Sequence, residues 1–160
     1  RDRSLAIAYF QDGSLGLPKK TISRFKQKVR ERTRRNKPGT LESKIEFLNQ
    51  LLIGWISYFR LSRSRSEFVN LDGWIRRKIR TIKLKQLKRR YTIWKFYRNR
   101  GLTENNAWLG VLGGKGLWCL SRTPQSHMAM NMAWFKEMGL INLTERWQEL
   151  GLAAGNRLGA

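Results

Sequence analysis

The most distinctive chemistry in this sequence is positive charge concentrated in one stretch. Residues 76–100 contain twelve lysines and arginines and no aspartate or glutamate. Lys and Arg side chains bind phosphate groups and release the counterions that a nucleic acid carries. A run of three or four cations is usually a solvated face, but twelve without an intervening acid are poorly explained in that way. The stretch therefore predicts a surface that contacts a sugar–phosphate backbone.

The candidate nucleic-acid-binding residues are thirteen cations in and beside this stretch. They are Arg63, Arg65, Arg76, Arg77, Arg80, Lys83, Lys85, Lys88, Arg89, Arg90, Lys95, Arg98 and Arg100. Aromatic residues interleave with the later cations, and aromatic rings stack well on nucleobases. These are Tyr91, Trp94, Phe96 and Tyr97, of which half or more are expected to belong to the core instead.

Residues suited to metal binding or catalysis are sparse. The one histidine, His127, and the one cysteine, Cys119, cannot form a zinc site by themselves. Polymerase and nuclease chemistry needs clustered carboxylates that hold metal ions, but the aspartates Asp2, Asp12 and Asp72 are far apart in the sequence. No serine or cysteine lies in a recognisable nucleophile elbow. We therefore predict no catalytic residue, no metal and no cofactor on this chain.

The composition is that of a folded, strongly basic protein. The 33 Lys and Arg against 11 Asp and Glu give a formal charge of +22. Such a charge is usually neutralised by a polyanion, for which nucleic acid is the first candidate and an anionic membrane surface the second. Hydrophobic residues make up 41%, with seven Trp and seven Phe, so the chain is not a disordered basic tail. The absence of a long apolar run favours an intracellular location, and the first residue, Arg rather than Met, suggests a fragment or a processed product.

Three helices are predicted in the first half of the chain, at 19–34, 40–60 and 66–90. The second has the clearest pattern, because apolar residues follow one another at spacings of three and four. They are Leu41, Ile45, Leu48, Leu52, Trp55 and Phe59. By this spacing Trp55 and Phe59 are predicted to be core residues rather than a ligand platform.

The charge distribution suggests a domain boundary near residue 90. Residues 1–90 hold 25 Lys and Arg and 7 Asp and Glu, whereas residues 91–160 hold 8 and 4. The second part is predicted to contain short helices at 92–99, 103–109, 124–136 and 142–149. Residues 1–18 are predicted to form an N-terminal remnant, which is either a short hairpin or the edge of a sheet whose remainder is absent. Residues 151–160 are predicted to form a disordered tail.

Several motifs resemble a known family. "LNQLLIGWISYFRLS" followed by "LDGWIRRKIRTIKLKQLKR" is similar to the maturase-specific region of group II intron reverse transcriptases. "GLWCLSRTP" and "AMNMAWFKEMGLINLTERW" resemble the segment that closes many of these proteins, especially the compact bacterial kind. The similarity extends from about Lys19 to Leu150.

The resemblance implies an all-α fold in which a three-helix, thumb-like bundle at 19–90 is followed by a small region of short helices. It implies that this bundle, the X or thumb domain, holds the template–primer duplex and binds intron RNA to promote splicing. Residues 91–150 would correspond to a DNA-binding segment, and Arg76, Arg77 and Arg80 to the family's thumb arginines. The implied partners are group II intron RNA, a DNA target or template–primer duplex, and the fingers and palm of a reverse transcriptase, in the bacterial cytoplasm or an organelle.

The fingers and palm, with their Tyr-x-Asp-Asp motif, are absent from this sequence. Magnesium is therefore implied only for the missing palm, and polymerase activity cannot be assigned to this chain. A stand-alone structural RNA-binding component of a ribonucleoprotein is the alternative hypothesis. An enzyme in its own right is a third and weaker one.

Overall fold

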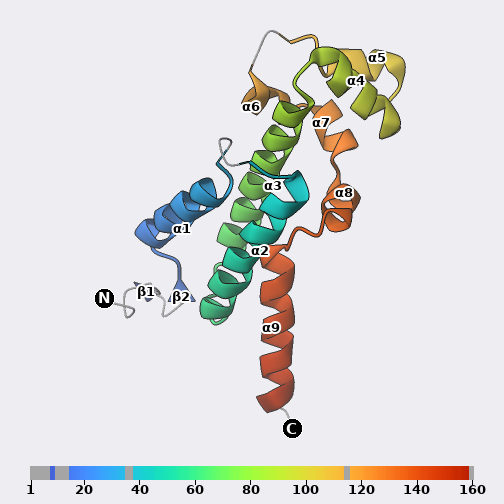
Figure 1. The fold of residues 1–160 in the computed structure, drawn as a ribbon. Helices are drawn as coiled ribbons and strands as arrows, with labels where there is room; N and C mark the ends of the chain where they lie inside the picture. Colours follow the sequence, from blue (N-terminus) through green and yellow to red (C-terminus); the bar gives the residue numbers. More distant parts are fainter. Residues whose placement is uncertain (1–7, 10–14, 35–37, 114–115, 159–160) are drawn as a thin grey trace. The chain divides into compact units, whose positions relative to one another are not determined.

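The computed structural model describes residues 8–9, 15–34, 38–113 and 116–158, and most of these residues are helical (Figure 1). The strands in the described ranges are the two-residue β1 (Ala8–Tyr9) and β2 (Leu15–Gly16), which pair antiparallel with Tyr9 opposite Leu15. The other residues of the predicted hairpin, 1–7 and 10–14, lie outside the described residues. The predicted all-α fold class, a bundle followed by short helices, is confirmed.

The long helices occupy nearly the predicted ranges. They are α1 (Lys19–Arg32), α2 (Leu41–Tyr58) and α3 (Arg65–Leu87). The third helix stops before its expected end at residue 90 because Lys88 adopts a left-handed backbone conformation with a φ of 64°. The chain turns there and α4 (Arg90–Asn99) begins two residues later.

The chain divides into two compact units, and α2 and α3 each contribute to both. One unit contains residues 1–34, 46–73 and 141–160, and the other contains residues 35–45 and 74–140. This division differs from the boundary expected near residue 90, since it falls within α3 between Gly73 and Trp74. Charge marks what a surface carries, whereas compactness follows the packing of apolar side chains, so the two need not coincide.

The core of the first unit is built around a cluster of aromatic rings. Trp55 stacks on Phe25 of α1 with ring centroids 4.1 Å apart. It also contacts Phe59 at 4.7 Å and the edge of Phe68 of α3 at 5.9 Å. Phe25, Phe59 and Phe68 are buried, and Trp55 is half-buried. The predicted core role of Trp55 and Phe59 is therefore confirmed.

The last helix of this unit, α9 (Leu143–Leu158), is attached through its first turn. Asp72 of α3 accepts the backbone N–H groups of Leu143 and Thr144 at 2.8 and 2.9 Å, and the Thr144 hydroxyl at 2.7 Å. A carboxylate that accepts amides at a helix start caps the helix and suits the positive end of its dipole. Further along α9, the indole N–H of Trp147 donates to the Ser62 carbonyl at 2.8 Å.

The prediction of a disordered tail at 151–160 is wrong for residues 151–158, which continue α9. A helix that is already started extends at little cost, and Leu and Ala are strong helix formers. These preferences outweigh the two glycines, Gly151 and Gly155. Residues 159–160 lie outside the described residues.

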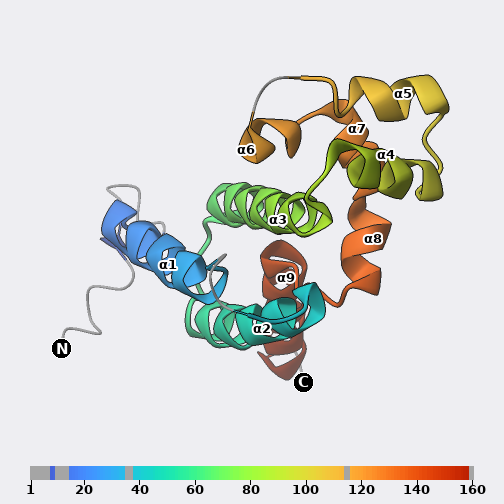
Figure 2. The same ribbon diagram turned by 45° about the horizontal axis from the view of Figure 1, so that its top comes forward.

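The second unit is completed by α4 and four shorter helices. They are α5 (Glu104–Leu109), α6 (Leu117–Leu120), α7 (Pro124–Ala129) and α8 (Met132–Glu137). In both views α5 lies beside α4 (Figures 1 and 2), and both helices contact α7. Packing is close at Gly110, because a Cβ there would lie 2.8 Å from the Tyr97 ring.

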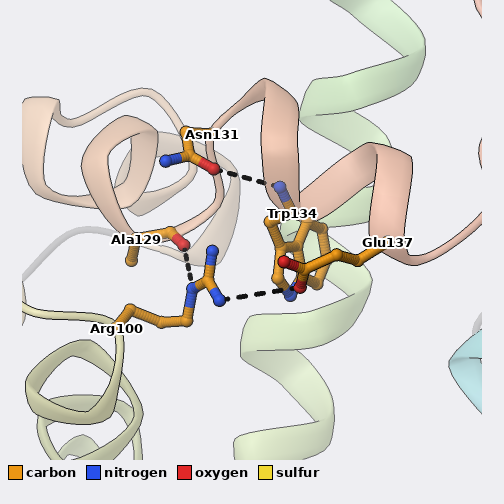
Figure 3. A network of polar contacts seen from close by, with 5 residues as sticks. All are labelled: Arg100, Ala129, Asn131, Trp134 and Glu137. Atoms are coloured by element: carbon orange, nitrogen blue, oxygen red, sulfur yellow. Dashed lines mark hydrogen bonds and ion pairs between the residues drawn. The ribbon is translucent and has the colours of Figure 1, made fainter.

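The helix predicted at 124–136 is in fact two helices. It is interrupted at Met130, whose φ and ψ of −111° and 66° are not helical. Asn131 then caps the second helix, since its side-chain oxygen accepts the backbone N–H of Trp134 at 3.0 Å (Figure 3). The short helix α6 was not predicted from the sequence.

Candidate nucleic-acid interface

Arg80 has a structural position that the sequence did not predict. It is only 5% exposed, its Nε donates to the Met130 carbonyl at 3.1 Å, and its guanidinium lies 4.9 Å from the Phe135 ring centroid. Burial, and then the charge of Arg76, lower its pKa to about 10, so it stays protonated at neutral pH. This placement corrects the expectation that Arg80 is presented to a ligand, and the reason is that α3 buries more than one stripe of side chains.

Arg77 is similarly engaged within the protein. Its Nη2 and Nε donate to the Trp118 carbonyl at 2.8 and 3.2 Å, and its Nε also lies 3.3 Å from the Ser121 hydroxyl. The guanidinium lies 3.9 Å from the centroid of the Trp118 ring, which is cation–π distance. These contacts hold α6 against α3.

Arg100 makes the third contact of this kind (Figure 3). Its Nε donates to the Ala129 carbonyl at 2.7 Å, and its Nη1 lies 3.8 Å from Glu137 Oε2. Arg77, Arg80 and Arg100, which we call the tethering arginines, thus donate to backbone carbonyls in α6, at Met130 between α7 and α8, and in α7, respectively. The first two act from α3, and Arg100 follows α4. Arg98 is exposed but also donates internally, to the Leu102 carbonyl at 3.0 Å.

A second group of predicted cations is exposed. We call it the α3–α4 cationic cluster, and it comprises Lys85, Lys88, Arg89, Arg90 and Lys95. These five residues lie at the end of α3, in the turn at Lys88, and on α4. Within the described ranges none of their side chains has a hydrogen-bond, ion-pair or ring partner. Their charges are therefore available to an external anion.

The remaining predicted cations differ in exposure. Arg63 and Arg65 are exposed, beside and at the start of α3 in the first unit. Arg76 and Lys83 are half-buried on α3, and the Lys83 ammonium lies 5.1 Å from the Phe96 ring centroid. The thirteen predicted residues thus do not share one environment, because some are exposed while Arg77, Arg80 and Arg100 are bonded within the protein.

The aromatic residues of α4 and α5 form an ordered stack. Tyr91 and Trp94 have ring centroids 5.6 Å apart and planes inclined by 24°, and Trp94 and Trp108 are 5.1 Å apart and inclined by 23°. Tyr97 is fully buried, Phe96 is half-buried, and Tyr91 is 61% exposed. Of these four aromatics, Tyr97 is therefore a core residue, Trp94 and Phe96 are intermediate and Tyr91 is exposed, so the expected core share of half or more is met only if the half-buried rings are counted.

Sequence reasoning missed two kinds of residue. The contacts of Trp108 with Trp94 on α4 and of Trp118 with Arg77 on α3 were not predicted, because no spacing in the sequence indicates a contact between residues so far apart. The cations Lys20, Arg24 and Lys28 of α1 were not counted as candidates, although their spacing of four puts them on one exposed helix face.

His127, on α7, has a pKa below its usual value. Partial burial disfavours the imidazolium, and the charges of Arg80 and Arg76 disfavour it further. In the part of the chain that the structure describes, no three His, Cys, Asp or Glu side chains come together as a metal site would require. The described helices include none long and apolar enough to cross a bilayer.

A comparison with protein families matches the stretch of sequence that contains the predicted cations. The model of the group II intron maturase-specific domain matches residues 22–101, which is half of the chain. The chain belongs to the group II intron maturase-specific domain family. The maturase-specific domain includes nearly all of α1 and the whole of α2, α3 and α4, and with them every predicted cation and the tethering arginines. A search of curated proteins found no match.

Membership in the family supports a maturase role in group II intron splicing and implies group II intron RNA as the general partner. The helices α6, α7 and α8 lie outside the matched residues. The tethering arginines that hold them lie inside, so the maturase-specific domain contacts a segment beyond its own limits.

Proposed function

We propose that this chain is the intron-RNA-binding part of a group II intron reverse transcriptase. In this proposal the α3–α4 cationic cluster contacts RNA phosphates. The observation that carries the proposal is the exposure of five cations without an internal partner among the described residues, inside the stretch that matches the maturase-specific domain. Lys and Arg side chains in this state bind phosphates with a net gain, because counterions leave the RNA.

The proposal assigns the tethering arginines a different role. Because Arg77, Arg80 and Arg100 already donate to carbonyl groups of the protein, they position the short helices and are not the main phosphate contacts. Arg63 and Arg65 remain proposed RNA contacts on the first unit, where they are exposed.

Two further functions belong to the proposal on the strength of the resemblance. The three-helix part would act as the thumb that holds the template–primer duplex beside the fingers and palm of a compact bacterial-type enzyme. Residues 91–150 would contribute DNA binding. The proposal includes no cofactor on this chain, and it places the protein in the bacterial cytoplasm or an organelle.

The experiment is a titration of the full chain with a group II intron RNA at several salt concentrations, followed by fluorescence anisotropy. Five phosphate contacts predict a slope of about −4 in a plot of log affinity against log salt concentration. An affinity that does not change between low and moderate salt would overturn the proposal. In a parallel assay, the chain with a fingers and palm fragment should stimulate splicing of the intron, and a stand-alone RNA-binding component would not need that fragment.

A further inference from the structure

The aromatic stack on α4 and α5 is open at one end. Trp108, Trp94 and Tyr91 follow one another as nearly parallel rings, with centroids 5.1 and 5.6 Å apart. Trp94 and Trp108 are half-buried, whereas Tyr91 is 61% exposed. In the described ranges, the ring of Tyr91 has no ring or cation partner other than Trp94. The outer face of Tyr91 can therefore accept another flat ring.

The surroundings of Tyr91 have the charge that a nucleic acid requires. Arg90 precedes it, and Lys95 lies four residues later, which places its side chain next to Tyr91 on the exposed face of α4. Both cations are exposed, and the nearest acid along the chain is Glu104. A phosphate on either side of a stacked base would meet one of these charges.

We propose that Tyr91 is a stacking site for an unpaired RNA base, with Arg90 and Lys95 contacting the flanking phosphates. The proposal rests on the proposed function, which supplies RNA as the ligand, and adds that this end of the surface prefers single-stranded RNA. A base inside a duplex is covered on both faces by its neighbours and cannot reach the ring. An unpaired base can continue the series of rings, and such stacking is tolerant of sequence because every base has an aromatic face.

The preference for single-stranded RNA comes from stacking on the Tyr91 ring, because phosphate contacts do not distinguish single strands from duplexes. The α3–α4 cationic cluster attracts duplex and single strand alike, since both carry phosphates. Only the ring of Tyr91 distinguishes a base that is free from one that is paired. The proposal therefore predicts a change in selectivity when the ring is removed, in addition to a change in affinity.

The test compares Tyr91→Ala and Tyr91→Phe in the full chain. The probes are a short oligouridylate, the same oligomer with abasic residues, and a duplex RNA of equal length. Tyr91→Ala should bind oligouridylate about 5- to 100-fold more weakly than the wild type, as expected for the loss of one stacked base. Its affinity for the abasic oligomer and the duplex should stay within about twofold. Tyr91→Phe, which keeps the ring, should bind all three probes like the wild type.

Tyr58→Ala is the matched control, since Tyr58 is an exposed tyrosine of the other unit, 48% exposed on α2. It should leave the affinity for oligouridylate unchanged. A second measurement does not depend on the stability of a variant: oligouridylate that carries 5-iodouridine should crosslink on illumination to the peptide that contains Tyr91.

The outcomes separate this proposal from the proposed function. If the wild type binds all three probes and Tyr91→Ala is unchanged, the stacking site is refuted while RNA binding stands, and the exposed ring is then better explained as a contact for protein. An equal loss on duplex and single strand would also refute it, because stacking would not be the cause. Failure of the wild type to bind any probe would remove the proposed function as well.

Discussion

At the scale of single residues, arginines that look alike in the sequence have two different roles. Arg77, Arg80 and Arg100 donate to carbonyl groups, whereas Arg89 and Arg90 have no partner within the described residues. Composition and charge density cannot separate these roles. The sequence held one indication for Arg80 nevertheless, because the apolar residue Leu84 lies four residues later. In the structure Leu84 is fully buried. Residues four apart share a helix face, so Arg80 belongs to a second buried stripe of α3.

The buried position of Arg80 leads to a prediction about stability. Arg80→Ala should lower the free energy of unfolding by about 2–4 kcal/mol, because it leaves the Met130 carbonyl without its donor and opens a cavity beside Phe135. Chemical denaturation monitored by circular dichroism measures this. Arg76→Ala, on the same helix, removes a side chain that has no hydrogen-bond or ion-pair partner among the described residues, and it should change the stability by less than about 0.5 kcal/mol. Equal stabilities for Arg80→Ala and the wild type would show that the contact with Met130 contributes nothing.

His127 provides a prediction about proton binding. Its pKa should lie below the ordinary value of 6.5, because burial and the charges of Arg80 and Arg76 disfavour the imidazolium. The folded state then binds its proton less readily than the unfolded state does. His127 therefore does not reduce the free energy of unfolding above pH 6.5. As the pH falls from 6.5 towards the lower pKa of the folded state, the free energy of unfolding decreases.

This pKa can be measured directly by NMR, since His127 is the one histidine of the chain and its ring signals need no assignment. Arg76→Ala should raise the pKa towards 6.5, whereas Arg122→Ala should leave it in place. A pKa above 6.5 in the wild type would contradict the described surroundings of His127.

At the scale of elements, the helices are held together by a few polar contacts as well as by the core. The start of α9 depends on Asp72, which accepts two backbone amides and one hydroxyl. Asp72 is buried and lies on α3, more than seventy residues before its partners. It therefore does for α9 what a local capping residue does for most helices.

Asp72→Ala should destabilise the protein by about 2–4 kcal/mol, because two amides and a hydroxyl lose their acceptor in a buried position. Hydrogen exchange should show faster exchange at the first turn of α9, while α4 and α5 keep their protection. Thr144→Val, which removes the hydroxyl contact alone, should cost about 1 kcal/mol. A slow-exchanging α9 in Asp72→Ala would mean that the contacts of Trp147 suffice to hold the helix.

The sequence allowed the long helices to be predicted well and the short ones only in part. The apolar spacing in α2 is regular over several turns, and its predicted stripe is buried apart from half-buried Trp55. The break at Met130 could not be foreseen, because Asn131 acts as a cap only after the chain has bent. The tail was expected to be disordered because chain termini often are, but α9 continues to Leu158.

At the scale of the whole molecule, the net charge and the family both indicate a nucleic acid as the partner, but neither shows which residues contact it. The charge of +22 predicted a polyanion, and the match to the maturase-specific domain implies group II intron RNA. The sequence could not show which cations meet the RNA, because burial depends on packing between residues far apart in the chain. The structure assigns Arg77 and Arg80 to tethers and leaves the α3–α4 cationic cluster exposed.

The central claim is that the exposed cluster makes the phosphate contacts, and one comparison tests it most directly. Arg89→Ala with Arg90→Ala removes two cations from the cluster, and Arg122→Ala with Lys136→Ala removes two exposed cations elsewhere in the same unit. The two double variants have the same net charge, so an effect of overall charge would be equal in both. Binding to intron RNA is measured by anisotropy over a range of salt concentrations.

The account predicts that the Arg89 and Arg90 variant loses affinity and that the magnitude of its log–log salt slope falls by about 1.5, since two phosphate contacts disappear. The Arg122 and Lys136 variant should keep the slope of the wild type. Equal slopes for the two double variants would contradict the claim, because RNA would then respond to total charge and not to the exposed cluster.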